Sequence, residues 1–178
     1  MVKTLILHGW GGSDFPHWQS YLACELAKDY GTVSFPLLID KDNPKKDTWM
    51  KQVRDILSDF KPDIVVCHSL ANTLWFHLCN EEKITPVKKL FLVAPPSLTT
   101  EVEEVSTFFP VSAPQNIYAQ EIILITSTND PYMPNAEAND LAKQLDVKHL
   151  VLKDAGHINA ESGFGEWSDI NLMVKGLK

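Results

Sequence analysis

The sequence predicts an α/β protein built on one doubly wound sheet of about six parallel strands, with helices on both faces. Three observations support this fold class. Short apolar runs rich in β-branched residues alternate with segments of helical period. The length of 178 residues corresponds to about one domain, and no internal repeat or low-complexity tract interrupts the alternation. We therefore expect a single domain over residues 1–178, with right-handed crossovers between its strands.

The expected elements follow one another as strand–helix pairs. The runs expected to be strands are residues 3–8, 32–37, 63–67, 89–94, 121–127 and 148–152. Each expected helix carries an apolar stripe at helical spacing, which packs on the sheet. The stripes consist of Trp18, Leu22 and Leu26; Met50, Val53, Ile56, Leu57 and Phe60; Ala71, Leu74, Trp75 and Leu78; Leu141, Ala142 and Leu145; and Trp167, Ile170, Val174 and Leu177.

One long connector, residues 95–120, breaks the alternation. It contains four prolines and the apolar pair Phe108 and Phe109, which would be costly to expose. Connectors of this length are usually functional or mobile. We expect a small flap over a cavity rather than a linker, with a loop packed down for structure alone as the alternative. No large cap domain is expected.

Composition excludes several classes of protein. The 16 Lys and Arg against 23 Asp and Glu give a net charge of −7, so a nucleic-acid partner is not expected. Three cysteines without a CxxC pair indicate reduced thiols and a cytoplasmic location. No apolar run approaches the roughly 20 residues of a membrane span, and the N-terminal apolar run is too short for a signal peptide. We therefore expect no membrane partner.

A candidate nucleophile follows the third expected strand. Residues 63–71 read Asp-Ile-Val-Val-Cys-His-Ser-Leu-Ala, so a buried strand ends, a sharp turn carries Ser69, and a helix begins at once. This is the context of a nucleophile elbow, whose usual pattern is G-x-S-x-G. Here the flanking positions are Cys67 and Ala71. Both are small, which keeps the turn feasible.

Two further residues complete a Ser-His-Asp constellation. Asp130 follows the strand 121–127, and His157 follows the strand 148–152. Parallel strands place the loops at their carboxyl ends along one rim, so these side chains are expected to meet Ser69 there. Asp154 is a rival acid, but three residues of a short loop seldom put a carboxylate behind the imidazole. His68 should point away from the Ser69 hydroxyl, since adjacent strand residues face opposite ways.

The loop after the first strand is expected to help hold an oxyanion. In folds that carry a nucleophile elbow, the loop after an early strand and the residue after the nucleophile supply the donors, which here would be the backbone N–H groups of Trp10 and Leu70. The alternative, a dinucleotide-phosphate loop, fails the G-x-G-x-x-G spacing because Asp14 occupies the last glycine position. The remaining histidines, His8, His17, His77 and His149, read as structural or surface residues. No metal-ligand set and no cofactor are expected.

These motifs resemble the small, lidless α/β-hydrolases of the retinoblastoma-binding-protein-9 and YdeN-like serine hydrolase family. The Ser127-x-x-Asp130-Pro131 segment, paired with the late Gly156-His157, is the most specific part. The resemblance also covers His8-Gly9, the segment 17–22, Trp49, the elbow 68–70 and the segment 132–134. It implies an α/β-hydrolase fold, with Ser69, Asp130 and His157 as nucleophile, acid and base. The family commonly has glycine where this chain has Cys67 and Ala71.

The sequence thus predicts a serine hydrolase that acts on small acyl esters or amides through an acyl-enzyme. A small-molecule acyl substrate is the expected partner, and no feature indicates a protein partner. Aromatic residues near the rim are the candidates for contact with the substrate: Trp10, Phe15, Phe108, Phe109 and Tyr132. Two alternatives stay open, a catalytically weak hydrolase fold used for protein binding, and an acyltransferase that uses the same acyl-enzyme.

Overall fold

The computed structural model describes residues 1–177 and contains one six-stranded sheet in which every neighbouring pair of strands is parallel. The strands are β1 (Val2–Leu7), β2 (Gly31–Ser34), β3 (Ile64–His68), β4 (Val87–Val93), β5 (Ala119–Ser127) and β6 (Lys148–Leu152). Their order across the sheet is β2-β1-β3-β4-β5-β6. The predicted fold class, a doubly wound sheet of about six parallel strands, is therefore confirmed.

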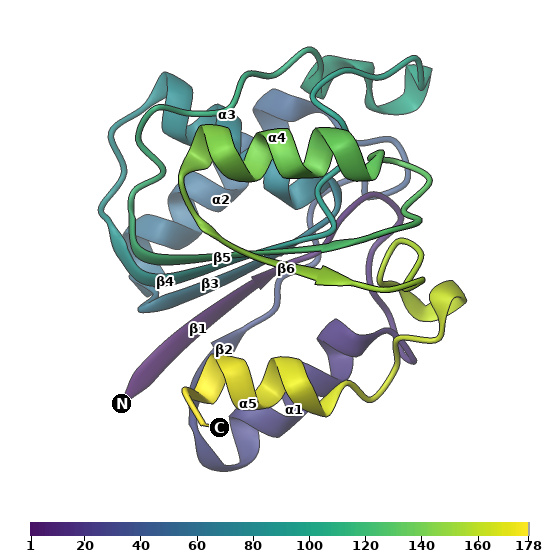
Figure 1. Ribbon diagram of the computed structural model, residues 1–178. Coiled ribbons are helices and arrows are strands. Elements are labelled where there is room, and N and C mark those ends of the chain that lie inside the picture. Colours follow the sequence, from purple (N-terminus) through teal and green to yellow (C-terminus); the bar gives the residue numbers. More distant parts are fainter. Residues whose placement is uncertain (178) are drawn as a thin grey trace.

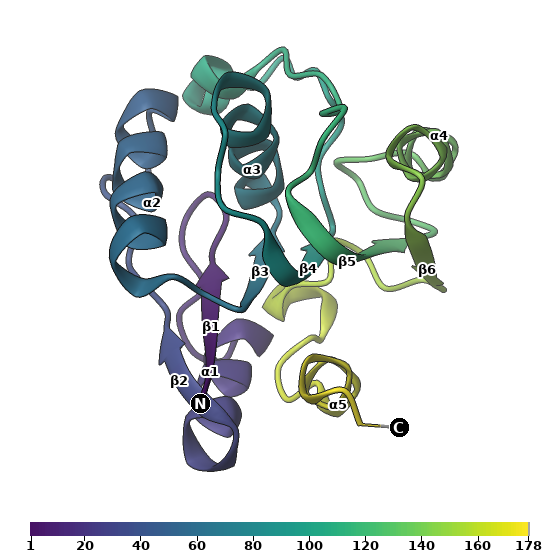
Figure 2. The same ribbon diagram turned by 90° about the vertical axis from the view of Figure 1, so that its left-hand side faces the viewer.

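Helices cover both faces of the sheet (Figures 1 and 2). On one face lie α1 (Trp18–Asp29) and α5 (Ser168–Lys175); on the other lie α2 (Lys46–Phe60), α3 (Leu70–Glu81) and α4 (Asn135–Leu145). Two short 3₁₀ helices, η1 (Glu103–Phe108) and η2 (Ala160–Ser162), were not predicted. Within residues 1–177 there is no large cap domain over the sheet.

The core consists of two apolar clusters, one on each face of the sheet, because successive strand residues point to opposite faces. In β3, Val65 and Cys67 join the cluster under α2, α3 and α4, whereas Ile64 and Val66 join the cluster under α1 and α5. All four are buried. Burial on both faces explains why the central strands read as continuous apolar runs, and it makes the sheet a rigid base for the loops at its carboxyl edge.

The observed boundaries of β1, β3, β4 and β5 lie within two residues of the expected ones, whereas two elements end earlier than expected. β2 stops at Ser34 instead of residue 37, since Pro36 has no N–H to add to the ladder, and Leu37 is exposed. The last helix is shorter than its expected stripe. Trp167 lies just before it, and Gly176, in the left-handed conformation at φ 71°, ends it before the exposed Leu177.

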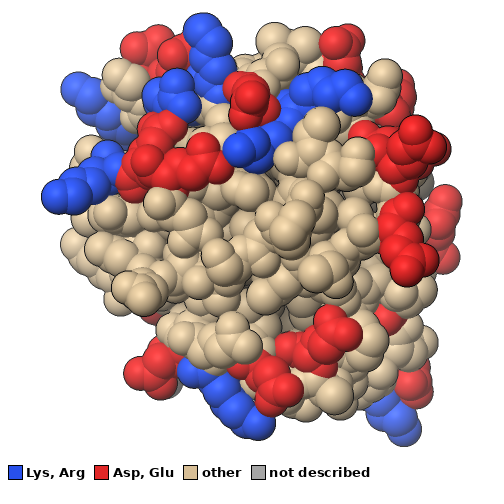
Figure 3. All heavy atoms as spheres, turned by 90° about the horizontal axis from the view of Figure 1, so that it is seen from above, with Lys and Arg blue, Asp and Glu red and all other residues tan. Residues whose placement is uncertain are grey.

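The connector 95–120 is partly built into the core. Its 3₁₀ helix η1 buries Val105 and Phe108, and the following stretch buries Val111 and Ile117. Figure 3 shows the face that carries α2, α3 and α4. Its charged side chains gather toward the margins and leave the middle largely free of them. No helix within residues 1–177 is both long enough and apolar enough to cross a membrane.

Candidate active site

Ser69 occupies the sharp turn between β3 and α3, with backbone angles φ 54° and ψ −125°. A non-glycine residue with positive φ is strained, and such strain persists only where the surroundings enforce it. Here Ser69 N–H donates to the Val93 carbonyl at 3.0 Å. The Asn72 side-chain amide donates to the carbonyls of Ser69 (2.8 Å) and Val93 (2.9 Å). The neighbouring strand and the first turn of α3 thus hold the serine on the rim of the sheet.

Close packing around the turn requires small residues at three positions. Cys67 and Ala71, which replace the usual glycines, are both fully buried. The tightest approach is at Gly9, where an added Cβ would lie 2.7 Å from the Ser69 Cβ and 3.1 Å from its hydroxyl oxygen. Gly9 therefore lets the loop after β1 pass directly against the serine.

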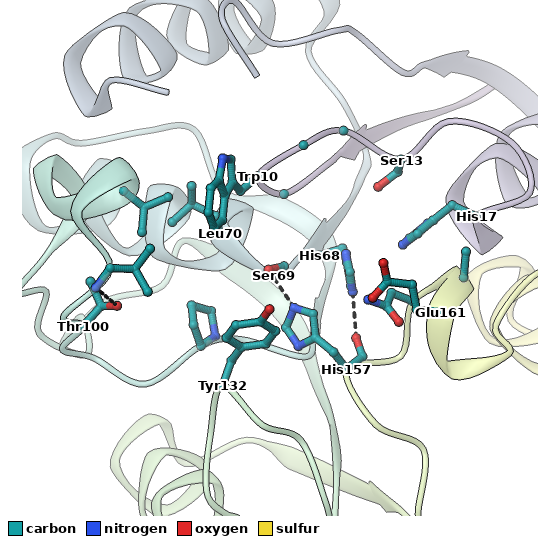
Figure 4. A pocket seen from close by; sticks show the side chains of 18 of the residues that line it. Trp10, Ser13, His17, His68, Ser69, Leu70, Thr100, Tyr132, His157 and Glu161 are labelled. Carbon is teal, nitrogen blue, oxygen red and sulfur yellow. Dashed lines mark hydrogen bonds between the residues drawn. The ribbon is translucent and has the colours of Figure 1, made fainter. Parts of the chain in front are cut away.

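The structure brings Ser69, His157 and Asp130 together. The Ser69 Oγ lies 2.8 Å from His157 Nε2 (Figure 4). On the other side of the ring, Nδ1 lies 3.0 and 2.9 Å from the two Asp130 carboxylate oxygens. Asp130 and His157 are both buried. The rival Asp154 is exposed and accepts from the Thr128 hydroxyl at 3.3 Å instead.

A network of short polar side chains fixes the loop that carries His157. The Asn129 Oδ1 accepts from the Ser127 hydroxyl (2.8 Å) and from Gly156 N–H (2.7 Å). His157 N–H donates to the Ser162 Oγ at 3.1 Å. These roles of Asn129 and Ser162 were not predicted from the sequence. The available signal was the run of polar residues that directly follows the apolar strand 122–125.

His68, the last residue of β3, also holds the loop that carries His157. Its Nε2–H donates to the His157 carbonyl at 3.1 Å, so the ring does not bond to the Ser69 hydroxyl, as expected (Figure 4). The His68 ring lies 4.9 Å from that of His17 and 5.2 Å from that of His157. Burial, with smaller effects from the neighbouring His157 and His17, holds the pKa of His68 well below its ordinary value. His68 is therefore neutral at physiological pH.

His8 and His17 are not surface residues. His8 accepts from Leu38 N–H at 2.8 Å, and burial lowers its pKa. His17 caps α1, with Nδ1 accepting from Gln19 N–H at 3.2 Å. Burial first, and then the nearby His157 and His8, lower the pKa of His17 to about 4. His17 also lines the cavity described below. From the sequence it was expected to be a structural or surface residue, not a cavity residue.

Trp10 and Leu70, whose backbone N–H groups are the expected oxyanion donors, both line the same cavity as Ser69. Leu70 is the first residue of α3, where an N–H has no partner inside the helix. The Trp10 turn is held by Gly11 N–H donating to the Lys41 carbonyl (2.9 Å) and by the Trp10 indole donating to the Asp42 carbonyl (3.0 Å). Within residues 1–177 neither of the two expected oxyanion donors has a hydrogen-bond acceptor.

A cavity of about 390 Å³ opens over Ser69 and His157 and has two unlike halves. The mainly apolar half is formed by Trp10 and Leu70 and by the connector residues Pro96, Val102, Val105 and Phe109, with Thr100 as a polar residue on the same side. The polar half is formed by Ser13, His17, His68, Asn159 and Glu161. Figure 4 shows Trp10 and Leu70 on one side of Ser69, and Ser13, His17 and Glu161 on the other.

Three of the five aromatic residues expected to contact a substrate line this cavity: Trp10, Phe109 and Tyr132. Phe108 does not, because its ring is fully buried in the core, 5.4 Å from that of Trp49. Phe15 does not either, since it lies exposed on the surface against Tyr21. Among residues 1–177, no group of three or more His, Cys, Asp or Glu side chains is arranged to hold a metal ion.

Comparison with known proteins agrees with this geometry. The model of a family described as serine hydrolase matches residues 4–175. The ydeN gene product of Bacillus subtilis superimposes with a TM-score of 0.88 at 18% identity, covering 99% of this chain and 98% of that one. A protein described as a YdeN-like hydrolase, from Pectobacterium atrosepticum, superimposes with a TM-score of 0.77 at 24% identity, covering 99% and 90%.

More distant structures share the same architecture. Est1E from Butyrivibrio proteoclasticus superimposes with a TM-score of 0.64 at 13% identity, covering 98% of this chain and 86% of that one. At these identities the structural likeness shows the α/β-hydrolase fold. Among curated proteins, no sequence matches the chain significantly.

Proposed function

The chain belongs to the serine hydrolase family and is an enzyme, and from that premise we propose that Ser69 is its nucleophile, His157 its general base and Asp130 the acid that orients His157. The continuous line of hydrogen bonds from the Ser69 hydroxyl through the imidazole to the Asp130 carboxylate carries the proposal. A serine hydroxyl is a poor nucleophile unless an adjacent base takes its proton. The 2.8 Å separation between Oγ and Nε2 is within reach of that transfer.

The first half of the reaction forms an acyl-enzyme. Ser69 Oγ attacks the carbonyl carbon of the substrate while its proton passes to His157 Nε2. Asp130 stabilises the imidazolium and fixes its orientation through Nδ1–H. The carbonyl oxygen becomes an oxyanion and accepts from the N–H groups of Trp10 and Leu70, each of which contributes about 3 kcal/mol to the transition state. His157 then gives its proton to the leaving alcohol or amine as that bond breaks.

The second half returns the enzyme to its starting state. Water enters the position of the leaving group and loses a proton to His157 as it attacks the acyl carbon. As the second oxyanion collapses, the bond between the acyl carbon and Ser69 Oγ breaks, the acid is released, and His157 returns its proton to Oγ to restore the hydroxyl. The substrates we propose are small acyl esters or amides, because the cavity has a volume of only about 390 Å³ and connector residues such as Val105 and Phe109 line it.

An activity-based probe tests the assignment directly. A fluorophosphonate should label the folded wild-type protein at Ser69, identified by mass spectrometry of the labelled peptide. Ser69→Ala should lose both the label and the hydrolysis of p-nitrophenyl butyrate, while its thermal unfolding matches that of the wild type. Labelling at another residue would refute Ser69 as the nucleophile. Absence of labelling of the folded protein would refute the proposal and favour a catalytically weak, protein-binding member of the family.

An acyltransferase would share the acyl-enzyme, so a second measurement separates it. Added primary alcohols or amines at millimolar concentration should leave free acid as the main product. A product ratio dominated by the transferred acyl group would identify an acyltransferase instead.

A further inference from the structure

The polar half of the cavity contains a buried hydroxyl with no partner. Ser13 is 5% exposed, and its Oγ has no hydrogen-bond partner among residues 1–177. Its carbonyl is already used, since it accepts from the Ser20 hydroxyl at 2.7 Å. Figure 4 shows the Ser13 oxygen turned toward the space that His17, His68 and Glu161 also face. An unpaired buried hydroxyl is unfavourable, and a bound polar group that pairs with it would recover that free energy.

His17 presents a hydrogen-bond donor to the same space. Since Nδ1 accepts from Gln19 N–H, the proton of the neutral ring is on Nε2. A pKa of about 4 keeps this ring neutral at physiological pH. Within the part of the chain that the structure describes, Nε2 is paired with no protein acceptor. It is therefore available to donate to an oxygen of a ligand.

The charge of the cavity restricts the ligand further. Asp14 and Glu161 line it, and no Lys or Arg among residues 1–177 does so. A carboxylate or phosphate on the ligand would be repelled by these two acids. An ammonium group would be attracted by the two acids but offers no acceptor to the Nε2–H donor of His17. A hydroxyl suits both neighbours, because it accepts from His17 and donates to Glu161.

The polar half also lies beside His157, the residue that protonates the leaving group. The His157 carbonyl accepts from His68, and the His68 and His157 rings are 5.2 Å apart. Asn159 and Glu161 follow His157 closely in the chain and line the same half. The departing oxygen receives its proton from His157 Nε2, so the group attached to that oxygen extends alongside these residues.

We propose that the polar half is a leaving-group subsite for a neutral, hydroxylated alcohol, and that the preferred substrates are esters of a polyol with a short apolar acid. This inference rests on the proposed function. The bond that breaks is the ester bond between the acyl carbon and the alcohol oxygen. The acyl group stays on Ser69, and the alkoxide oxygen takes the proton from His157. Ser13, His17 and Glu161 hold the free hydroxyls of the alcohol during that step.

Three butanoate-sized esters test the subsite. They are 2,3-dihydroxypropyl butyrate, propyl butyrate, and the propyl ester of 3,4-dihydroxybutanoic acid, in which the two hydroxyls lie on the acyl side. Each kcat/KM is divided by the rate constant for alkaline hydrolysis of the same ester, which removes differences in intrinsic reactivity. We expect this normalised kcat/KM to be about tenfold or more higher for the first ester than for propyl butyrate. The value for the third ester should be close to that for propyl butyrate.

Two independent variants locate the preference. Ser13→Ala should lower the ratio of the first ester to propyl butyrate by about fivefold, since it removes one hydrogen bond. Glu161→Gln should lower it by a similar factor, because its neutral amide oxygen accepts a weaker hydrogen bond from the ligand hydroxyl than the carboxylate does. Matched controls are Ser58→Ala and Glu166→Gln, both exposed and away from the cavity, which should leave the ratio unchanged. Thermal unfolding of every variant checks that the protein is folded.

The outcomes separate the two proposals. A wild-type ratio near one, a ratio that neither variant changes, or a preference that follows hydroxyls on the acyl side would overturn the leaving-group subsite. Ser69-dependent hydrolysis of propyl butyrate would leave the proposed function intact in each of those cases. Absence of Ser69-dependent hydrolysis of all three esters, together with absence of fluorophosphonate labelling, would refute the proposed function itself.

Discussion

Replacing Gly9 with alanine places a methyl group against Ser69. The added Cβ would lie 2.7 Å from the Ser69 Cβ, 3.1 Å from its Oγ and 3.2 Å from the His68 carbonyl oxygen. Carbon atoms in contact normally stay about 3.5–4.0 Å apart, so the loop and the serine must separate by about 1 Å. The serine cannot yield freely, because Val93 and Asn72 hold its strained backbone.

A displacement of about 1 Å at a reacting atom costs about a hundredfold in rate, or about 2.7 kcal/mol of transition-state stabilisation. We therefore expect Gly9→Ala to lower kcat/KM for p-nitrophenyl butyrate, and the rate of fluorophosphonate labelling, by about a hundredfold. The control is Gly176→Ala, since Gly176 has φ 71° with nothing near its added Cβ and lies far along the chain at the end of α5. That variant should lose stability but keep its rate. A folded Gly9→Ala enzyme within about threefold of the wild-type rate would refute the reasoning.

Three further predictions follow from the site. Asp130→Asn should lower kcat by about 10³- to 10⁴-fold at pH 7 with little change in unfolding temperature, because an amide cannot stabilise the imidazolium; a loss below tenfold in steady-state kinetics would argue against Asp130 as the acid. Asn129→Ala should lower the unfolding temperature by about 5 °C and kcat by about tenfold, since it leaves Ser127 Oγ–H and Gly156 N–H without their acceptor, and Asn129→Asp should recover part of both. Folding lowers the pKa of His17 from 6.5 to about 4, so the unfolded chain binds the proton first and stability falls as the pH drops below 6.5. This residue alone should account for about 2 kcal/mol between pH 7.5 and 5. Urea unfolding of His17→Asn, which keeps a cap for α1, should show a correspondingly smaller pH dependence, and an unchanged one would contradict the assignment.

Much of the fold follows from local patterns in the sequence. The strand 148–152 was predicted with the boundaries that the structure has. The alternation of Ile64 and Val66 with Val65 and Cys67 between two cores is what produces an unbroken apolar run. Position at the carboxyl end of a parallel strand was enough to bring Ser69, Asp130 and His157 together, although they are separated by 61 and 27 residues along the chain.

The remaining features depend on tertiary geometry that a pattern does not encode. Phe108 and Phe109 are adjacent and chemically identical, yet η1 ends between them and turns Phe108 into the core and Phe109 into the cavity. His17 is both a helix cap and part of the cavity, because the loop before α1 passes beside His68. The acceptor role of Asn129 toward Gly156 depends on the distance between two loops 27 residues apart.

The two halves of the cavity come from separate stretches of chain. Most of the apolar wall belongs to the connector between β4 and β5, whereas the polar wall comes from the loops that follow β1 and β6, together with His68 at the end of β3. Substitutions or insertions in residues 96–109 can therefore alter the accepted acid without disturbing the groups that face the alcohol. Selectivity for the acid part of the substrate and selectivity for its alcohol part can therefore change independently while the sheet stays the same.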